Sequence, residues 1–134
     1  MRVFIDSNIP MYVAGRDHPL REPSRRVLES ARAEEFEACT STEVLQEILY
    51  RYLGLRRRDL AGMVYDLFVQ FCPVVLPVTL ADTDRARQLI AAARGPSVRD
   101  AIHAAVMLNN GIGKIATFDK GFDRIAGIER LPLR

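Results

Sequence analysis

Two kinds of hydrophobic pattern alternate along the chain. Short runs rich in β-branched and aromatic residues, such as the opening RVFI, are followed by longer segments in which apolar residues recur every three or four positions. Glycine, proline or polar residues mark each change of pattern. This alternation is typical of an α/β protein with a mostly parallel sheet.

The short runs are predicted to be strands and the longer segments helices. Strands are expected at residues 2–6, 36–40, 74–78, 114–118 and 129–133. Helices are expected at residues 9–14, 23–33, 43–53 after the caps Ser41 and Thr42, 57–71, 80–94, 98–109 and 122–126. Gly54 is expected to stop the third helix. The sixth, with its AIHAAVML content, is apolar almost all round and is therefore predicted to pack on several sides.

Composition favours one globular domain over residues 1–134, because 134 residues with 49% apolar content suffice for a single core. No run approaches the about 18 to 20 apolar residues of a membrane helix, and Asp6 interrupts the first apolar run too early for a signal peptide. A cytoplasmic protein without a membrane partner is expected.

Cys39 and Cys72 stand in apolar surroundings and are predicted to be buried packing residues, not a disulfide or a zinc site.

The net charge of +2 argues against strong nonspecific binding to polyanions. Nearly all of the positive charge is arginine, which suits bidentate contacts with phosphate. Arginine clusters at residues 56–58 and at Arg21, Arg25 and Arg26. Taken alone, such clusters are typical of solvated helix faces.

Three acids are predicted to meet at one edge of the sheet. Asp6 ends the first strand, Asp119 follows the strand KIATF, and Asp100 falls in the first turn of the sixth helix. In parallel α/β sheets the carboxyl ends of the strands and the starts of the helices that follow lie at the same edge. Each acid alone has a structural explanation as a cap or turn residue, but their convergence does not.

The third helix starts at the same edge and adds Glu43 and Glu47, which are four residues apart and share a face. Geometry alone does not choose between them. Carboxylates this close repel one another unless a cation neutralises them, and an all-oxygen site suits Mg²⁺ or Mn²⁺ better than zinc. Such a site is typical of phosphodiester hydrolysis.

Four segments together resemble a PIN-domain ribonuclease, and more narrowly a VapC-type toxin of a toxin-antitoxin pair. They are FIDSNI, STEVLQEILYRY, RDAIHAAVM and ATFDKGFDRI, in the family's order. The resemblance implies a three-layer α/β/α sandwich with a central, mostly parallel five-stranded sheet. It also implies catalytic, metal-binding acids at Asp6, Glu47, Asp100 and Asp119, so that Glu47 is preferred over Glu43. RNA cleavage with Mg²⁺ or Mn²⁺, a homodimer and a protein antitoxin that covers the site are implied in the same way.

Four neighbouring residues are candidates for supporting roles. Ser7 and Asn8 would position Asp6 or would start the first helix. Thr117 resembles the family's hydroxyl residue near the site, or is simply a strand threonine. Asp123 would supply a fifth acid, although a surface acid on the last helix is the better interpretation.

His103 lies three residues after Asp100 and shares its face, yet in an apolar helix it is predicted to be packed and hydrogen-bonded, not a metal ligand. Arg99 and the run Arg56, Arg57 and Arg58 are candidate contacts for RNA.

Two further functions are considered beside the nuclease. A phosphoacceptor signalling domain also places aspartates at strand ends, but it would need a lysine after the last strand, where this chain reads ERLPLR. A PIN-like module that binds RNA or a partner without cutting it is the other alternative.

Overall fold

The sheet of this protein is parallel throughout. The computed structural model describes residues 1–92 and 94–134, and within them one five-stranded sheet has the order β3-β2-β1-β4-β5. Its strands are β1 (Arg2–Ile5), β2 (Glu37–Ser41), β3 (Val74–Leu76), β4 (Lys114–Ala116) and β5 (Glu129–Arg130). The four neighbouring pairs are all parallel, which confirms the predicted α/β class.

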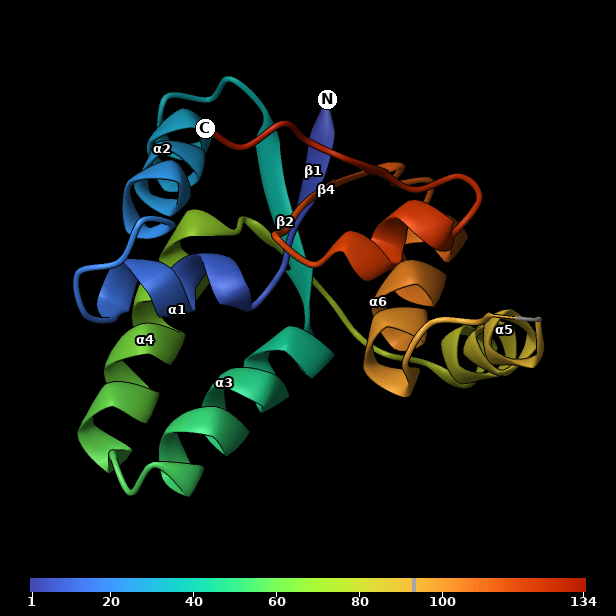
Figure 1. Cartoon of the computed structure of the whole chain (residues 1–134), viewed down its shortest axis with the longest axis horizontal. Coiled ribbons are helices and arrows are strands. Elements are labelled where there is room, and N and C mark those ends of the chain that lie inside the picture. The colour runs from blue at the N-terminus through green and yellow to red at the C-terminus, as the bar shows by residue number, and fades with distance from the viewer. Residues whose placement is uncertain (93) are drawn as a thin grey trace.

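Helices cover both faces of the sheet. They are α1 (Asn8–Ala14), α2 (Arg21–Arg32), α3 (Thr42–Gly54), α4 (Arg58–Phe71), α5 (Leu80–Ala91), α6 (Val98–Asn109) and the 3-10 helix η1 (Lys120–Arg124). Helices α1, α2 and α4 lie on one side of the strands, and α5 and α6 lie on the other (Figure 1). Among the described residues, no helix is long and apolar enough to cross a membrane.

The order of the strands reverses at β1. The chain builds β2 and β3 on one side of β1 and then β4 and β5 on its other side. In such sheets the crevice at the carboxyl ends of the strands on either side of the reversal is the usual ligand site. Ile5 of β1 is paired with Ala116 of β4, so the residues that follow them, Asp6 and Thr117, emerge side by side.

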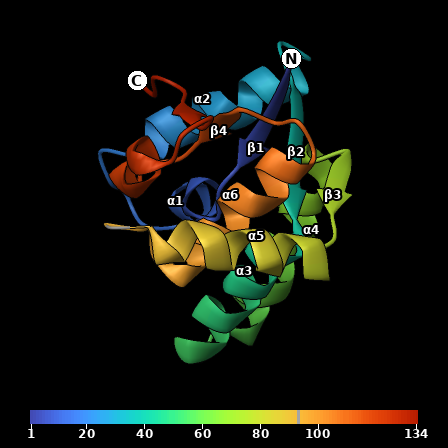
Figure 2. The same ribbon diagram turned by 90° about the vertical axis from the view of Figure 1, so that its right-hand side faces the viewer.

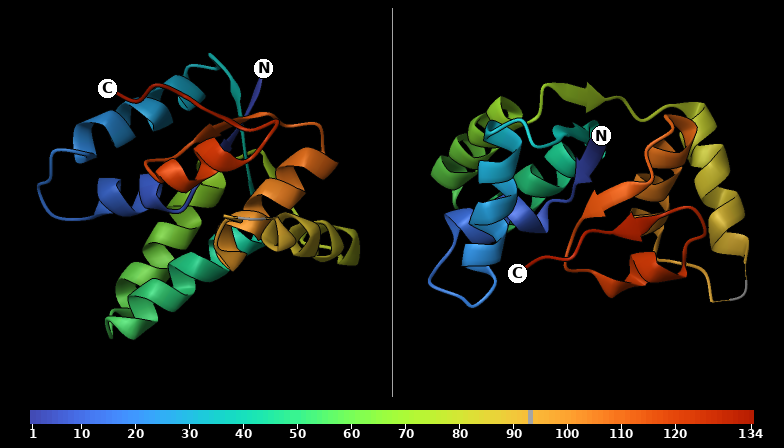
Figure 3. Two further views of the ribbon diagram at one scale, coloured as in Figure 1. Left: turned by 45° about the vertical axis from the view of Figure 1, so that its right-hand side comes forward. Right: turned by 90° about the horizontal axis from the view of Figure 1, so that it is seen from above.

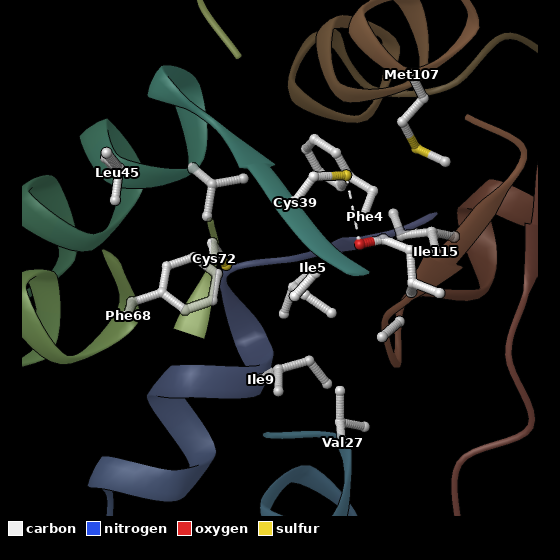
Figure 4. Close-up of a cluster of buried hydrophobic side chains, with 14 of the residues drawn as sticks. Phe4, Ile5, Ile9, Val27, Cys39, Leu45, Phe68, Cys72, Met107 and Ile115 are labelled. Carbon is white, nitrogen blue, oxygen red and sulfur yellow. Dashed lines mark hydrogen bonds between the residues drawn. The ribbon is translucent and has the colours of Figure 1, made fainter. Parts of the chain in front are cut away.

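The core explains why β1 is central. Val3, Phe4 and Ile5 are all fully buried, as expected for a strand covered on both faces. Figure 4 shows Phe4 on the side of Met107 from α6, and Ile5 on the side of Ile9 from α1. Cys39 and Cys72 are buried free thiols, which confirms their prediction as packing residues.

Two helices begin at the carboxyl edge with a serine cap. Ser41 accepts a hydrogen bond from the Val44 N–H at 3.4 Å at the start of α3, and Ser97 accepts one from the Asp100 N–H at 3.2 Å at the start of α6. From this edge α3 runs away from the sheet and turns back through α4 as a hairpin (Figure 3). Helix α5 packs along α6 (Figure 2).

Several predicted ends are wrong by a few residues. The last three strands end at Leu76, Ala116 and Arg130, before the predicted residues 78, 118 and 133. Pro77 and Pro132 lack the N–H that would continue two of these ladders. The last helix is a 3-10 helix at Lys120–Arg124, not a helix at 122–126, because the Asp119 side chain caps it.

Helix α3 ends at Gly54, the residue predicted to stop it. Helix α5 ends at Ala91, not at 94, because Ala92 is extended and Arg94 has a φ of 61°. Residue 93, which the prediction placed in this helix, lies outside the described residues.

Candidate metal and catalytic site

A pocket of about 570 Å³ opens at the carboxyl edge of the sheet. Its walls come from four separate parts of the chain: the end of β1, helix α3, the start of α6 and the segment after β4. The lining residues are Asp6, Ser7, Asn8, Glu47, Ser97, Val98, Arg99, Asp100 and Asp119. We call this space the acidic pocket, because four carboxylates line it.

Asp6 is held at the floor of the acidic pocket. Its side chain is only 7% exposed. Oδ1 accepts the backbone N–H of Ser7 at 2.7 Å, and Oδ2 accepts the hydroxyl of Thr117 at 2.7 Å. Ser7 makes no side-chain cap for α1; its hydroxyl instead donates to Glu47 Oε2 at 2.9 Å. The capping interpretation of Ser7 is therefore wrong, and Ser7 links two of the acids.

Thr117 connects three groups of the acidic pocket. It is fully buried, and besides donating to Asp6 it accepts the side-chain amide of Asn8 and the backbone N–H of Asp119, both at 3.1 Å. Asn8 also reaches Asp6 Oδ2 at 3.4 Å. Thr117 is thus more than a strand threonine, and it and Asn8 orient the acids around them.

Glu47, and not Glu43, lines the acidic pocket. Glu47 lies in the second turn of α3 and is buried, whereas Glu43 is half-buried beside it. Arg99 Nη1 lies 3.6 Å from Glu47 Oε2 at the pocket rim, with 66% of the Arg99 side chain exposed. Burial raises the pKa of Glu43, and the charge of Glu47 raises it further. Spacing did not distinguish Glu43 from Glu47, and in the folded chain it is Glu47 that lines the acidic pocket.

His103 belongs to the same cluster, although its predicted role was only in packing. Its ring is 1% exposed and packs against Phe4 with centroids 5.7 Å apart. Nε2 contacts Glu47 Oε1 and lies 3.8 Å from Asp6 Oδ1. His103 is thus packed as predicted, and the polar partner of its Nε2 is the Glu47 carboxylate. Its spacing of three from Asp100 was the signal in the sequence.

Asp100 and Asp119 form the outer part of the pocket. Asp100 is half-buried, whereas Asp119 is exposed and accepts the Gly121 N–H at 2.8 Å. A Cβ at position 121 would lie 3.0 Å from Asp119 Oδ1 and 3.1 Å from Asp100 Oδ2, so glycine lets the chain pass close to both. Burial, and then the hydrogen bond and charge of Asp119, raise the pKa of Asp100 to about 7.

The buried groups Asp6, Glu47 and His103 shift one another's pKa values. Burial raises the pKa of Asp6, while His103 and the Thr117 hydrogen bond oppose that rise. Burial alone would lower the pKa of His103, but the contact with Glu47 and the charge of Asp6 outweigh it, so the pKa of His103 is raised. A histidine with a raised pKa offers Glu47 a proton and is a poor metal ligand.

The donor set fits a divalent cation. The Oδ1 of Asn8 is buried without a hydrogen-bond partner among the described residues. Carboxylate oxygens of Asp6 and Glu47 lie within 4.8 Å of each other, beside the ring of His103. Carboxylate oxygens crowded in this way suit Mg²⁺ or Mn²⁺, whose charge would offset their repulsion.

Two sets of predicted residues lie outside the acidic pocket. Asp123 is exposed and forms a two-pronged pair with Arg130 at 2.8 and 2.9 Å, which agrees with the preferred interpretation as a surface acid and not with a fifth acid of the site. Arg56 and Arg57 lie at the turn between α3 and α4 and Arg58 begins α4, so all three lie more than about 10 Å beyond Glu47 along α3. They do not lie at the pocket rim, because α3 carries them away from the sheet.

The reversed strand order and the carboxylates at the crevice together define a doubly wound α/β protein with an acidic site at the carboxyl edge of its sheet. The PIN domain model matches residues 3–128, and the chain belongs to the PIN domain family. Because the chain belongs to this family, the alternative hypothesis of a phosphoacceptor signalling domain is not supported.

Curated relatives cover nearly the whole chain. Ribonuclease VapC13 of Mycobacterium tuberculosis is 40% identical over 129 residues, which are 96% of this chain and 98% of that protein. Ribonuclease VapC23 of the same species is 37% identical over 117 residues, which are 87% of this chain and 92% of that one.

Solved structures share the fold at lower identity. VapC20 of M. tuberculosis, described as a toxin that cleaves the sarcin-ricin loop, has a TM-score of 0.72 at 21% identity and covers 88% of this chain and 90% of that chain. VapBC2 of Rickettsia felis, solved with a DNA fragment of its promoter, has a TM-score of 0.70 at 16% identity, with 98% and 100% covered. At these identities the likeness shows the fold alone.

Proposed function

We propose that this protein is an endoribonuclease that hydrolyses RNA phosphodiester bonds with a bound divalent cation and acts as the toxin of a toxin-antitoxin pair. The observation that carries the proposal is the convergence of Asp6, Glu47, Asp100 and Asp119 on one pocket. Relatives named ribonuclease VapC, 40% identical over 96% of the chain, support it.

In this proposal the four acids hold Mg²⁺ or Mn²⁺. A cation held there would supply water activation and charge neutralisation for hydrolysis of the phosphodiester. The buried pair Asp6 and Glu47 forms the floor, and Asp119 is the exposed side from which a phosphate approaches. Arg99 at the rim, which pairs with Glu47 at 3.6 Å and keeps most of its side chain exposed, would contact that phosphate.

Other groups keep the acids in place. The N–H of Ser7 orients Asp6 and the N–H of Gly121 orients Asp119. Because backbone N–H groups have fixed positions, the carboxylates are arranged before a cation or substrate binds.

A protein antitoxin is the proposed partner. A toxin-antitoxin complex from Klebsiella pneumoniae is among the solved structures of similar fold. We propose that the antitoxin covers the acidic pocket, and that the toxin is a cytoplasmic homodimer. Co-expression with a neighbouring small reading frame, compared with expression alone, tests the first proposal through growth.

The test of the enzyme compares three aspartate variants. Purified protein is incubated with mixed RNA in Mn²⁺, Mg²⁺ or EDTA. Asp6→Asn and Asp100→Asn are expected to lower cleavage by more than about 100-fold, since even groups that only support metal ligands are worth about 10- to 100-fold. Asp123→Asn is the matched control, because its carboxylate pairs with Arg130 outside the pocket.

The nuclease proposal fails if the wild-type protein leaves RNA intact in both metals, or if all three variants behave alike. Intact RNA together with tight binding of RNA by the wild-type protein would favour the alternative of a PIN-like module that does not cut.

A further inference from the structure

His103 is the buried histidine of the acidic pocket, and the proposed reaction assigns it no part. Its ring is 1% exposed, lies in the second turn of α6, and contacts both Phe4 of β1 and the carboxylate of Glu47 on α3. The other histidine of the chain, His18, is exposed in the loop after α1. A polar ring buried as deeply as that of His103 needs a polar partner.

Each of the two carboxylate oxygens of Glu47 faces a donor side chain. Nε2 of His103 contacts Oε1, and the hydroxyl of Ser7 donates to Oε2 at 2.9 Å. Arg99 is more distant, with Nη1 3.6 Å from Oε2. A glutamate side chain is long and flexible, so a carboxylate that reaches the pocket from the second turn of α3 has several rotamers open to it. Two buried donors, one on each oxygen, restrict Glu47 to one orientation.

The two ring nitrogens of His103 have different surroundings. Nδ1 is buried and has no partner among the described residues, whereas Nε2 faces Oε1 of Glu47. A proton on Nδ1 alone would lack an acceptor, so the ring carries a proton on Nε2. The charged ring and the neutral Nε2–H form both provide this donor, so the contact does not depend on the charge of the ring. A nitrogen that donates to Glu47 does not ligate a cation at the same time.

We propose that His103 is a positioning residue that acts through Glu47. Its Nε2–H and the hydroxyl of Ser7 hold the two oxygens of Glu47 in the orientation in which this carboxylate receives the cation. The inference rests on the proposed function, and it adds a role for a residue that is not one of the four acids. Loss of a group that orients a metal-binding carboxylate lowers metal affinity about 10- to 100-fold.

Two other roles compete with positioning. As a ligand, His103 would turn Nε2 toward the cation and give up its contact with Glu47. As a packing residue, it would only fill space beside Phe4, on the face of α6 that also carries Met107, four residues further along. Figure 4 shows Met107 on this side of Phe4. Neither role requires His103 to act through Glu47.

NMR of the imidazole nitrogens in EDTA tests the contact without a metal. In the His18→Gln form of the full chain, His103 is the sole histidine, so its signals are identified at once. We expect a proton on Nε2 that exchanges slowly with water because the ring is buried. This signal should shift in Glu47→Ala. It should persist when Mg²⁺ is added, because a ligating Nε2 would have lost its proton. A proton on Nδ1 alone, a signal indifferent to Glu47→Ala, or its loss in Mg²⁺ overturns the proposal.

Calorimetry with Mn²⁺ measures the effect on the cation. His103→Met fills the space of the ring without a donor, and we expect it to bind Mn²⁺ about 10- to 100-fold more weakly than the wild type. His103→Gln places an amide N–H near the position of Nε2 and should recover most of the lost affinity. A packing role predicts the reverse order, because methionine suits an apolar site better than glutamine. Met107→Leu, which alters packing on the same helix outside the pocket, is the control and should bind Mn²⁺ as the wild type does.

The failure of positioning differs from the failure of the proposed function. Positioning alone is overturned if the wild type binds Mn²⁺ and His103→Met binds it equally well, or if His103→Gln binds it no better than His103→Met. A wild type that binds no Mn²⁺, while its Nε2 proton still depends on Glu47, overturns the proposed cation site and not the contact between His103 and Glu47.

Discussion

The hydroxyl of Thr117 is the smallest group on which the acidic pocket depends. It donates to Asp6 at 2.7 Å and accepts from Asn8 and from the N–H of Asp119. The hydrogen bond to Asp6 favours the charged carboxylate and so lowers the pKa of Asp6 against the effect of burial. Without it, the Asp6 carboxylate would be harder to ionise and less well oriented toward a cation.

Thr117→Val keeps the shape of the side chain and removes the hydroxyl. We expect this variant to bind Mn²⁺ about 10- to 100-fold more weakly, the usual cost of losing a group that orients a metal ligand. RNA cleavage should fall in parallel. Isothermal calorimetry with Mn²⁺ measures the affinity.

Thr40→Val is the control for Thr117→Val. Thr40 is equally buried, but its hydroxyl donates to the backbone oxygen of Ile5 at 3.1 Å and to none of the acids. Its loss should lower the free energy of unfolding by about 1–3 kcal/mol while the Mn²⁺ affinity stays unchanged. Equal Mn²⁺ affinity in the two variants would contradict the role of Thr117.

For single residues, the sequence predicts where a side chain lies in the fold better than it predicts which groups that side chain contacts. Asp6, Asp100 and Asp119 could be placed at one edge because each directly follows a strand or starts a helix. The bond between Thr117 and Asp6 depends on the pairing of Ile5 with Ala116, a register between distant segments that no local pattern reveals. The contact of His103 with Glu47 depends in the same way on how α6 faces α3.

Helix α5 is attached to α6 by a buried polar network. Asp82 is 2% exposed and accepts both the N–H and the hydroxyl of Thr79 in a capping box. Its other oxygen accepts the amide of Asn109 at 2.8 Å, and Arg85 donates to Asn109 at 2.8 Å. One carboxylate thus caps α5 and binds the last residue of α6, the helix that carries Asp100 and His103.

Asp82→Ala removes the cap and leaves the Asn109 amide without its acceptor. We expect the free energy of unfolding to fall by about 1–3 kcal/mol, combining a lost cap with a lost buried hydrogen bond. Urea denaturation measures the change. Asp84→Ala, an exposed acid of the same helix, should change stability by no more than about 0.5 kcal/mol. A similar loss in both variants would show that removal of an acid from α5, and not loss of the network, is responsible.

The elements themselves could be predicted where periodicity and caps agree. Helix α6 has the predicted ends, Val98 and Asn109, because Ser97 caps it and its apolar pattern is continuous. The ends of β3 and β5 and of α5 were missed, because a strand ends where its pairing ends, and α5 ends where the backbone of Ala92 becomes extended. Those events depend on neighbours that the local sequence does not contain.

The whole molecule gathers its acids at the point where the strand order reverses. Neighbouring strands β1 and β4 deliver Asp6 and Asp119, while α3 and α6 start at the same edge and deliver Glu47 and Asp100. Such crowding raises the pKa of Asp6, through burial first, and the pKa of Asp100 to about 7. The folded chain without a cation therefore holds protons there that the unfolded chain would release.

The raised pKa values make the stability of the fold depend on pH. A carboxyl group whose pKa is higher in the folded than in the unfolded state makes the folded state bind more protons, so stability falls as pH rises from about 4 through about 7. The pKa of His103 is also raised, so its stabilising effect is present at low pH and is lost as pH rises through its folded-state pKa. All three groups act in the same direction.

A bound cation should oppose this trend, because it stabilises the ionised acids. We expect the Tm in EDTA to fall between pH 5.5 and 8, and the rise in Tm on adding Mn²⁺ to be larger at pH 8 than at pH 5.5, since protons compete with the cation below about pH 7. Asp100→Asn should flatten the decline in EDTA and reduce the Mn²⁺ effect, whereas Asp123→Asn, outside the pocket, should do neither. A Tm in EDTA that rises over this interval, or a Mn²⁺ effect independent of pH, would contradict the coupling of the pocket's protons to its cation.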